Sequence, residues 1–141
     1  MLGELPIRSA IIDGEIVASD AAGMPDFWPL FLRSAKPAEL HVWAFDLLAL
    51  DGKDLRKLPL ERRQARLQAL LRRFACPTVL ASEAFADSQA LLEVAERHKL
   101  EGVVSKRRGA PYRSGSCRGW RKVKTMAWRE ANKERWRLFE R

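Results

Sequence analysis

The hydrophobic residues gather in segments whose spacing predicts a series of β-strands. Residues 9–17 carry β-branched residues on both sides of an Asp-Gly-Glu step, which predicts a buried strand. Residues 40–50 are apolar almost throughout, with Asp46 as their one acid, and they end at the turn Asp51-Gly52. This segment predicts a second central strand, and residues 78–83 predict a short third one.

Two further segments have the spacing of amphipathic helices. Residues 60–74 place leucines and a phenylalanine at intervals of three, four and seven, with arginines between them, which predicts a helix with one apolar face. Asp87 or Ser88 can cap a second helix, which the apolar pattern carries to His98.

The remaining segments complete a mixed fold. Asp26 can cap a short helix over residues 27–31, and residues 126–141 are compatible with helix. Residues 102–106 and 120–125 predict two late strands joined by a loop rich in glycine, serine and arginine. Strands that alternate with helices, followed by a hairpin-like pair, indicate an α+β domain.

Composition narrows the class of protein. A chain of 141 residues is long enough for one domain with a core, and 47% hydrophobic with 31% charged residues is typical of a globular protein. No apolar run reaches the roughly 18 residues that span a bilayer, which favours a cytoplasmic protein without a membrane partner. Cys76 and Cys117 have no second ligand at zinc spacing, so we expect two free thiols.

The net charge of +8 is concentrated at one end of the chain. Residues 1–100 contain 13 Lys and Arg against 14 Asp and Glu, whereas residues 101–141 contain 13 against 4. Tryptophans are interspersed in this basic segment, and such a segment can neutralise phosphates and stack on bases. It therefore favours a nucleic-acid or nucleotide ligand over a merely solvated basic tail.

Charged residues within the predicted strands are candidates for chemistry. Glu15 in a buried strand would be costly unless it is paired or bound to a cation, so it is either salt-bridged or a site residue. Lys122 and Lys124 are two residues apart on a strand and should project to the same face. Such a pair suits a bound phosphate, although lysines at an exposed strand edge would give the same pattern.

Four strings in order resemble the motifs of ATP-dependent DNA ligases, most closely the bacterial end-joining type. Ile-Ile-Asp-Gly-Glu-Ile-Val at residues 11–17 resembles motif III, and Phe-Asp-Leu-Leu with Asp-Gly at residues 45–52 resembles motif IIIa. Glu-Gly-Val-Val-Ser-Lys at residues 101–106 resembles motif IV, and Trp-Arg-Lys-Val-Lys at residues 120–124 resembles motif V. The resemblance implies an α+β, ATP-grasp-like nucleotidyltransferase core truncated at its N-terminus.

The resemblance also implies roles for individual residues. Glu15 would contact the ribose or the metal environment, and Phe45 would stack on adenine. Glu101 would help to hold Mg²⁺ or Mn²⁺. Three lysines would bind the α-phosphate of ATP, namely Lys106, Lys122 and Lys124. Six arginines would track the phosphates of nicked or broken duplex DNA, namely Arg56, Arg107, Arg108, Arg113, Arg118 and Arg121.

One departure from the family pattern limits the expected activity. Such ligases use the lysine of a Lys-x-Asp-Gly motif as the nucleophile, and no such string occurs in the 141 residues. We therefore expect no catalytic nucleophile here. The motifs predict a partial adenylation domain over residues 1–125, a basic tail over residues 126–141 and no oligonucleotide-binding domain.

Three functions follow from these expectations. The first is the nucleotide- and DNA-binding part of a DNA ligase, inactive alone and completed by another polypeptide that supplies the missing motif. The second is a non-catalytic DNA-binding or partner-binding module from a truncated ligase gene. The third, an RNA-capping or RNA-ligase enzyme of the same superfamily, fits the strings at residues 45–48 and 120–124 less well.

Overall fold

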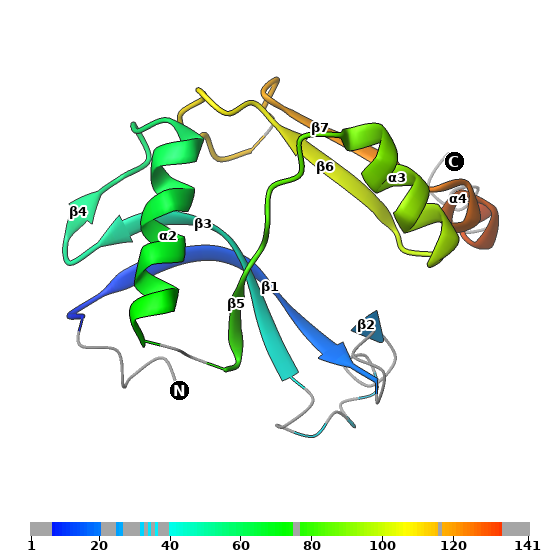
Figure 1. The fold of residues 1–141 in the computed structure, drawn as a ribbon, viewed down its shortest axis with the longest axis horizontal. Helices are drawn as coiled ribbons and strands as arrows, with labels where there is room; N and C mark the ends of the chain where they lie inside the picture. Colours follow the sequence, from blue (N-terminus) through cyan, green and yellow to red (C-terminus); the bar gives the residue numbers. More distant parts are fainter. Residues whose placement is uncertain are drawn as a thin grey trace. The chain divides into compact units, whose positions relative to one another are not determined.

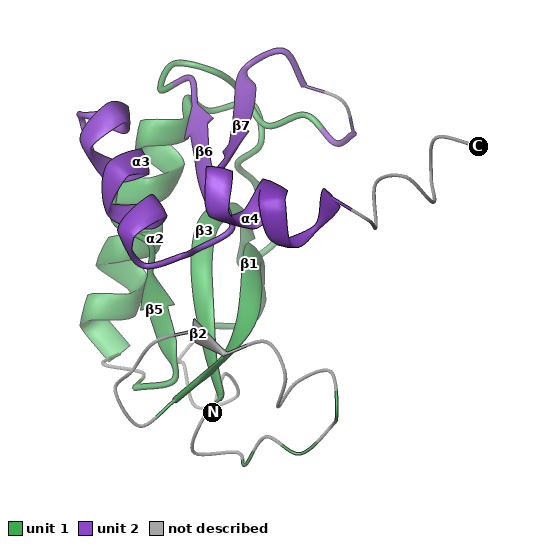
Figure 2. Ribbon diagram, turned by 90° about the vertical axis from the view of Figure 1, so that its right-hand side faces the viewer, with its two compact units in different colours: residues 1–83, 108–113 green, residues 84–107, 114–141 purple. Residues whose placement is uncertain are grey.

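The described residues fall into two compact units. The computed structural model describes residues 7–20, 25–26, 32, 34, 36, 40–74, 77–115 and 117–133 (Figure 1). Unit 1 comprises Met1–Glu83 and Arg108–Arg113, and unit 2 comprises Ala84–Arg107 and Ser114–Arg141 (Figure 2). Both units combine helices with strands, so the predicted α+β class is confirmed. No described helix is long and apolar enough to cross a membrane.

Unit 1 is built on a sheet with β3 as its central strand. Its strands are β1 (Ala10–Ser19), β2 (Pro25–Asp26), β3 (Leu40–Leu50), β4 (Lys53–Asp54) and β5 (Val79–Ala81). The order is β2-β1-β3-β4, and β5 pairs with β3 in parallel. The turn from β3 to β4 uses two residues with positive φ, Asp51 at 48° and Gly52 at 80°. That backbone suits the short hairpin turn predicted at Asp-Gly.

Helix α2 (Leu60–Phe74) packs against the sheet of unit 1, as Figure 1 shows. The predicted bounds are those observed, because the apolar spacing and the preceding Pro59 both mark the same start. The core between helix and sheet consists of Ala44, Leu47, Leu55, Leu67, Leu70, Leu71 and Val79. The strand predicted over residues 40–50 is likewise confirmed in full.

The prediction that the first strand is buried was wrong. In β1 only Ala18 is buried, while Ile11 and Ile16 are 58% and 59% exposed and Glu15 is exposed. Its apolar residues predicted burial on both sides, yet the described residues leave much of the strand open to solvent. The premise that Glu15 is a buried carboxylate therefore fails. Gly14 is confined nonetheless, since a Cβ there would lie 2.6 Å from the carbonyl oxygen of Trp43.

The described residues of unit 2 form a two-stranded antiparallel sheet and two helices. Its elements are α3 (Ser88–Arg97), β6 (Gly102–Lys106), β7 (Trp120–Lys124) and α4 (Met126–Ala131). Asp87 caps α3 through two backbone N–H groups, which confirms one of the two predicted caps. Gly102 has a φ of 154°, and a Cβ there would lie 2.1 Å from the carbonyl oxygen of Val123. Only glycine allows this close pairing of β6 with β7.

Several sequence expectations differ from the structure in extent. Asp26 lies in β2, and the helix expected after it falls on residues 27–31, which are outside the described residues. The strand expected over residues 78–83 is shorter, at Val79–Ala81. Helix α4 covers the beginning of the segment 126–141, and residues 134–141 are outside the described residues.

Candidate functional site

The register of β6 and β7 places three lysines on one face of the small sheet. Lys106 pairs with Trp120, Val104 pairs with Lys122, and Gly102 pairs with Lys124. Directly paired residues of antiparallel strands share a face, and residues two apart on a strand do so too. Lys106, Lys122 and Lys124 therefore project from the same side. The expectation that Lys122 and Lys124 share a face is met, and Lys106 joins them.

Two of these lysines are held by aromatic rings. The Lys106 ammonium lies 4.1 Å from the ring centroid of Trp120, and the Lys124 ammonium lies 4.4 Å from that of Trp128. Such cation–π contacts fix the direction of a lysine while leaving its N–H groups able to donate. Trp128 lies in the first turn of α4, whose N-terminus is held by the Glu96 carboxylate through the N–H groups of Met126 and Ala127.

Glu101, the predicted metal ligand, lies beside the lysine face. Its carboxylate is 65% exposed and forms an ion pair with Lys124. Within the described ranges, no group of three or more His, Cys, Asp and Glu side chains could hold a metal ion. Mg²⁺ is commonly bound by one or two carboxylates together with substrate phosphates. Glu101 fits that mode of binding as a single oxygen ligand.

Unit 1 carries the other two predicted nucleotide contacts on its paired strands β1 and β3. Phe45 is half-buried and lies between the buried Ala44 and Asp46, at an irregularity in the register of β3 against β1. Glu15 is exposed and pairs with Trp43, two residues before Phe45. Gln64 of α2 donates a hydrogen bond of 3.3 Å to the Phe45 carbonyl oxygen and so fixes the backbone at this position.

The predicted site residues are thus divided between the two units. Glu15 and Phe45 belong to unit 1, whereas Glu101 and the three lysines belong to unit 2. Within each unit these residues lie on adjacent strands, except Glu101, which directly precedes β6. The assembly of both sets around one nucleotide stays a prediction.

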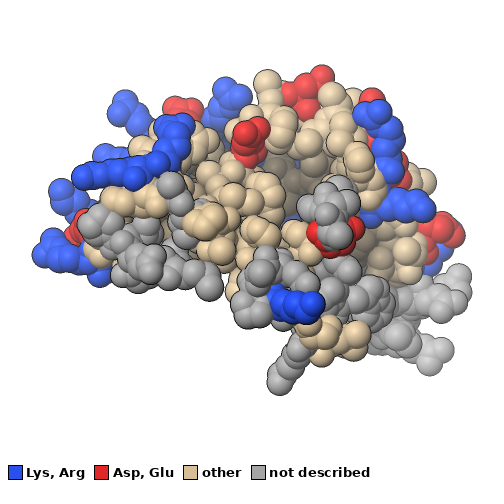
Figure 3. Space-filling model, turned by 60° about the horizontal axis from the view of Figure 1, so that its bottom comes forward, with Lys and Arg blue, Asp and Glu red and all other residues tan. Residues whose placement is uncertain are grey.

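The predicted DNA-binding arginines have exposed side chains. Five of them belong to the β6–β7 connection and its flanks and are exposed, namely Arg107, Arg108, Arg113, Arg118 and Arg121. Figure 3 shows lysine and arginine side chains (blue) at the surface on the face that it draws. Their exposure leaves them accessible to a phosphate backbone.

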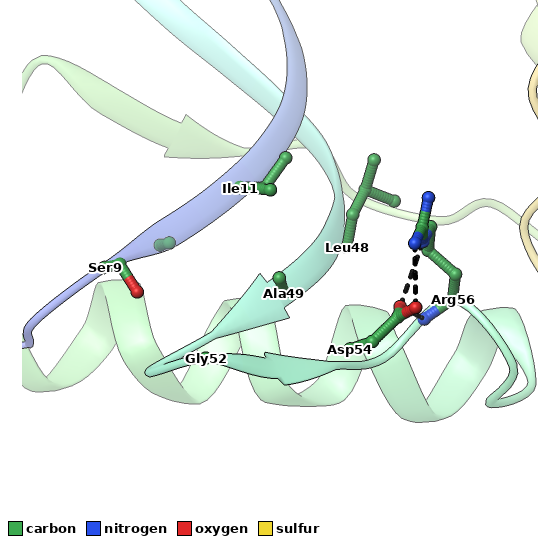
Figure 4. Close-up of a pocket in the computed structure, with 8 residues that line it drawn as sticks. Ser9, Ile11, Leu48, Ala49, Gly52, Asp54 and Arg56 are labelled. Atoms are coloured by element: carbon green, nitrogen blue, oxygen red, sulfur yellow. Dashed lines mark hydrogen bonds and ion pairs between the residues drawn. The ribbon is translucent and has the colours of Figure 1, made fainter.

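Arg56, the sixth of these arginines, is held in place by Asp54. Its Nε and Nη2 atoms donate to the two carboxylate oxygens of Asp54 at 3.0 and 2.8 Å (Figure 4). The hydrogen bond from the Arg56 side chain is the main cause that lowers the pKa of Asp54 from 3.8 to about 2. The pair borders an apolar pocket of about 360 Å³ that Ile11 and Leu48 also line.

A buried ion pair joins Asp46 and Arg63, and it was not among the contacts expected from the sequence. Arg63 is 1% exposed and Asp46 is 0% exposed. The Nε and Nη2 atoms of Arg63 donate to the two oxygens of Asp46 at 2.8 and 2.7 Å. Its Nη1 atom donates to the Ala110 carbonyl oxygen at 3.2 Å and also to the Leu58 carbonyl oxygen. The pair joins α2 to the strand that carries Phe45.

A signal for this pair was present in the sequence. Arg63 follows Leu60 by three residues and precedes Leu67 by four, so it occupies an apolar position of the helical pattern. An arginine at such a position needs a buried acid, and Asp46 is the one acid of the 40–50 strand. An arginine at an apolar position of the helix and a single acid in the apolar strand could together have predicted that the two residues are in contact.

Comparison with known proteins places the sequence in one family. It matches the family described as ATP dependent DNA ligase domain over residues 4–124. It is 37% identical over 126 residues to the multifunctional non-homologous end joining protein LigD of Pseudomonas aeruginosa, covering 87% of this chain and 15% of that protein. It is 37% identical over 131 residues to a probable DNA ligase of Sorangium cellulosum, covering 85% of this chain and 25% of that protein.

Solved structures agree with this placement. A mycobacterial DNA ligase D complexed with ATP and MES matches with a TM-score of 0.68 and 31% identity, over 82% of this chain and 38% of that chain. The ligase domain of Mycobacterium tuberculosis LigD matches with a TM-score of 0.67 and 32% identity over the same shares. The chain therefore spans only part of these relatives. It belongs to the ATP-dependent DNA ligase family, as part of the adenylation domain of the bacterial end-joining type.

Proposed function

We propose that this chain is the nucleotide- and DNA-binding part of a ligase adenylation domain that joins DNA strands during repair and recombination in the cytoplasm. The observation that carries this proposal is the face of β6 and β7 that presents Lys106, Lys122 and Lys124 together. Three cations on one small face suit an anion, and the phosphates of ATP supply it. A relative complexed with ATP and relatives named for end joining support the same ligand and process.

Each residue has a physical role in this function. The lysines bind the α-phosphate and offset the charge that develops at phosphorus during transfer. Phe45 stacks on adenine, which contributes roughly 1–3 kcal/mol. Glu15, exposed beside Trp43, accepts hydrogen bonds from the ribose or orders the metal environment. Mg²⁺ or Mn²⁺, held by Glu101 and the phosphates, would neutralise the negative charge of the nucleotide.

The proposed activity is completed by a second polypeptide segment. The family forms its covalent intermediate on the lysine of a Lys-x-Asp-Gly motif, which does not occur in residues 1–141. We propose that this chain alone binds ATP and DNA without becoming adenylated, and that a partner polypeptide bearing the motif restores the reaction.

The first prediction concerns the lysine face. Replacing Lys122 by alanine should weaken ATP binding roughly tenfold or more, because a charged hydrogen bond to phosphate is lost. Arg121→Ala is the matched control, since it removes one charge from the adjacent position of β7, on the opposite face. Isothermal titration with ATP and Mg²⁺ measures both. Equal losses in the two variants would contradict a phosphate site on the lysine face.

The second prediction concerns DNA. Binding to nicked duplex should weaken at least about tenfold between about 50 and 200 mM salt, because phosphate contacts release counterions. Arg118→Ala should lower the slope of log affinity against log salt by about one, whereas Arg72→Ala on α2 should leave it unchanged. Fluorescence anisotropy gives the slopes. If the affinity for nicked duplex did not depend on salt, the arginines would not contact the DNA phosphates and the prediction would be wrong.

The same experiments separate the competing function. A non-catalytic DNA-binding module would show the salt-dependent binding of nicked duplex and no specific effect of Lys122→Ala on ATP. Loss of ATP affinity in Lys122→Ala with retention in Arg121→Ala favours the ligase part instead.

A further inference from the structure

The connection between β6 and β7 contains a segment that belongs to the other unit. Arg108–Arg113 is part of unit 1, although both strands that it joins are part of unit 2. Figure 2 shows it as a green stretch of the chain between purple segments. The Arg107 N–H group donates to the Gly119 carbonyl oxygen at 2.8 Å and closes the end of the hairpin just before this segment.

Backbone hydrogen bonds hold the segment to the start of α2. The N–H groups of Leu60 and Glu61 donate to the carbonyl oxygens of Ala110 and Arg108 at 3.1 and 3.3 Å. These are two of the N–H groups that a helix leaves without internal partners at its first turn. The Tyr112 N–H group donates to the Arg56 carbonyl oxygen at 2.8 Å.

Arg63 adds a charged side-chain contact to these backbone bonds. Its Nη1 atom donates to the Ala110 carbonyl oxygen at 3.2 Å and to the Leu58 carbonyl oxygen. Asp46 already occupies Nε and Nη2, so the planar guanidinium has a fixed orientation and Nη1 points in one direction. One side chain thus joins β3, the loop before α2 and the β6–β7 connection.

The half-buried Tyr112 lies in the same environment. Burial raises the pKa of its hydroxyl, and the charges of Asp13 and Asp46 raise it further, whereas Arg63 and Arg56 oppose the shift. The 108–113 segment therefore lies near several charged residues of unit 1, and more than one hydrogen bond holds it in position.

We propose that Arg63 is a positioning residue that fixes the 108–113 segment and thereby favours nucleotide binding by the lysines of β6 and β7. The inference rests on the proposed function, in which one ATP contacts Phe45 of unit 1 and the lysines of unit 2. When Arg63 holds the 108–113 segment against unit 1, fewer unattached residues connect unit 1, which carries Phe45, to the strands that carry the lysines. A shorter free connection lowers the entropy that is lost when both sets bind one ligand.

Two variants distinguish the positioning role of Arg63 from the stability effect of a buried charge. Arg63→Lys keeps a cation beside Asp46, but a single ammonium cannot hold the carboxylate in two places and also reach Ala110. The double variant Asp46→Leu with Arg63→Met removes both buried charges and keeps the site filled with apolar atoms. Arg62→Met, at an exposed position of α2, is the control.

Amide hydrogen exchange of the full chain tests the positioning directly. In both Arg63 variants the amides of Leu60 and Tyr112 should exchange about tenfold faster than in the wild type, while the amides of β1 and β3 keep their protection. The affinity for ATP should fall about tenfold in both variants, as expected when a preorganised connection is released. Arg62→Met should change neither quantity.

The outcomes are distinguishable. Unchanged exchange at Leu60 and Tyr112 would overturn the positioning role, and so would faster exchange with unchanged ATP affinity. A wild-type chain that binds no ATP would refute the proposed function and with it the effect on the nucleotide. In that case faster exchange at Leu60 and Tyr112 would still support Arg63 as the residue that fixes the segment.

Discussion

Incubation of residues 1–141 with α-labelled ATP and Mg²⁺ is expected to leave the polypeptide unlabelled. A covalent adenylate requires an unprotonated amine directed in line at the α-phosphorus. Lys124 forms an ion pair with Glu101, and Lys106 lies over the Trp120 ring, so both make the contacts of charged ammonium groups. An ammonium group has no lone pair and binds phosphate without attacking it.

Addition of a polypeptide that bears Lys-x-Asp-Gly should produce the label. Denaturing electrophoresis after acid treatment distinguishes an acid-labile phosphoramidate from bound nucleotide. The Lys122→Ala chain, supplied with the same polypeptide, is expected to give much less label because a phosphate contact is missing. An acid-labile band at 16.1 kDa from this chain alone would contradict the proposal that it lacks the nucleophile.

Replacement of Arg63 by methionine is expected to lower the free energy of unfolding by about 3–5 kcal/mol. The variant leaves the Asp46 carboxylate, which is 0% exposed, without its cation. Removal of one partner of a buried pair costs more than removal of both, because the remaining charge stays desolvated. The double variant Asp46→Leu with Arg63→Met should therefore recover part of the loss.

Urea denaturation followed by tryptophan fluorescence or circular dichroism measures this effect. Arg62→Met is the matched control, because Arg62 is exposed on the same helix turn and its loss should change stability by no more than about 0.5 kcal/mol. If Arg63→Met and Arg62→Met lost the same stability, the Asp46–Arg63 pair would have no special role in holding α2 to β3.

The strongest predictions from the sequence were those with two independent signals. Helix α2 has both an apolar face and a proline at its start, and β3 has a continuous apolar run that ends at an Asp-Gly turn. For these elements, the apolar pattern and the proline or turn residues at the ends indicate the same bounds, and the structure has those bounds. The cap of α3 had two candidates in the sequence, Asp87 and Ser88, and the structure has Asp87.

The exposure of β1 could not be predicted in the same way. β-branched residues such as Ile11 and Ile16 favour a strand, but they do not reveal whether another element covers them. The face of a strand is a local property that follows from alternation, whereas burial depends on which distant segments pack on it. Glu15 was therefore assigned to a strand correctly and to a buried environment wrongly.

The candidate site shows the same limit. That Lys122 and Lys124 share a face follows from their spacing alone, whereas the addition of Lys106 requires the register of β6 against β7. The ion pair of Lys124 with Glu101 also depends on that register, because the two residues are far apart in the sequence. The Asp46–Arg63 contact depends on the packing of α2 on β3, although an arginine at an apolar position of the helix and a single acid in the strand were signals for it in the sequence.

Amide chemical shifts of the isotope-labelled chain, recorded during titration with ATP and Mg²⁺, test the central claim most directly. The account predicts that signals from both units move along one binding curve. The affected residues should include Glu15, Phe45, Lys106, Lys122 and Lys124. Shifts confined to one unit, or no shifts at millimolar ATP, would contradict a single nucleotide site built from these residues.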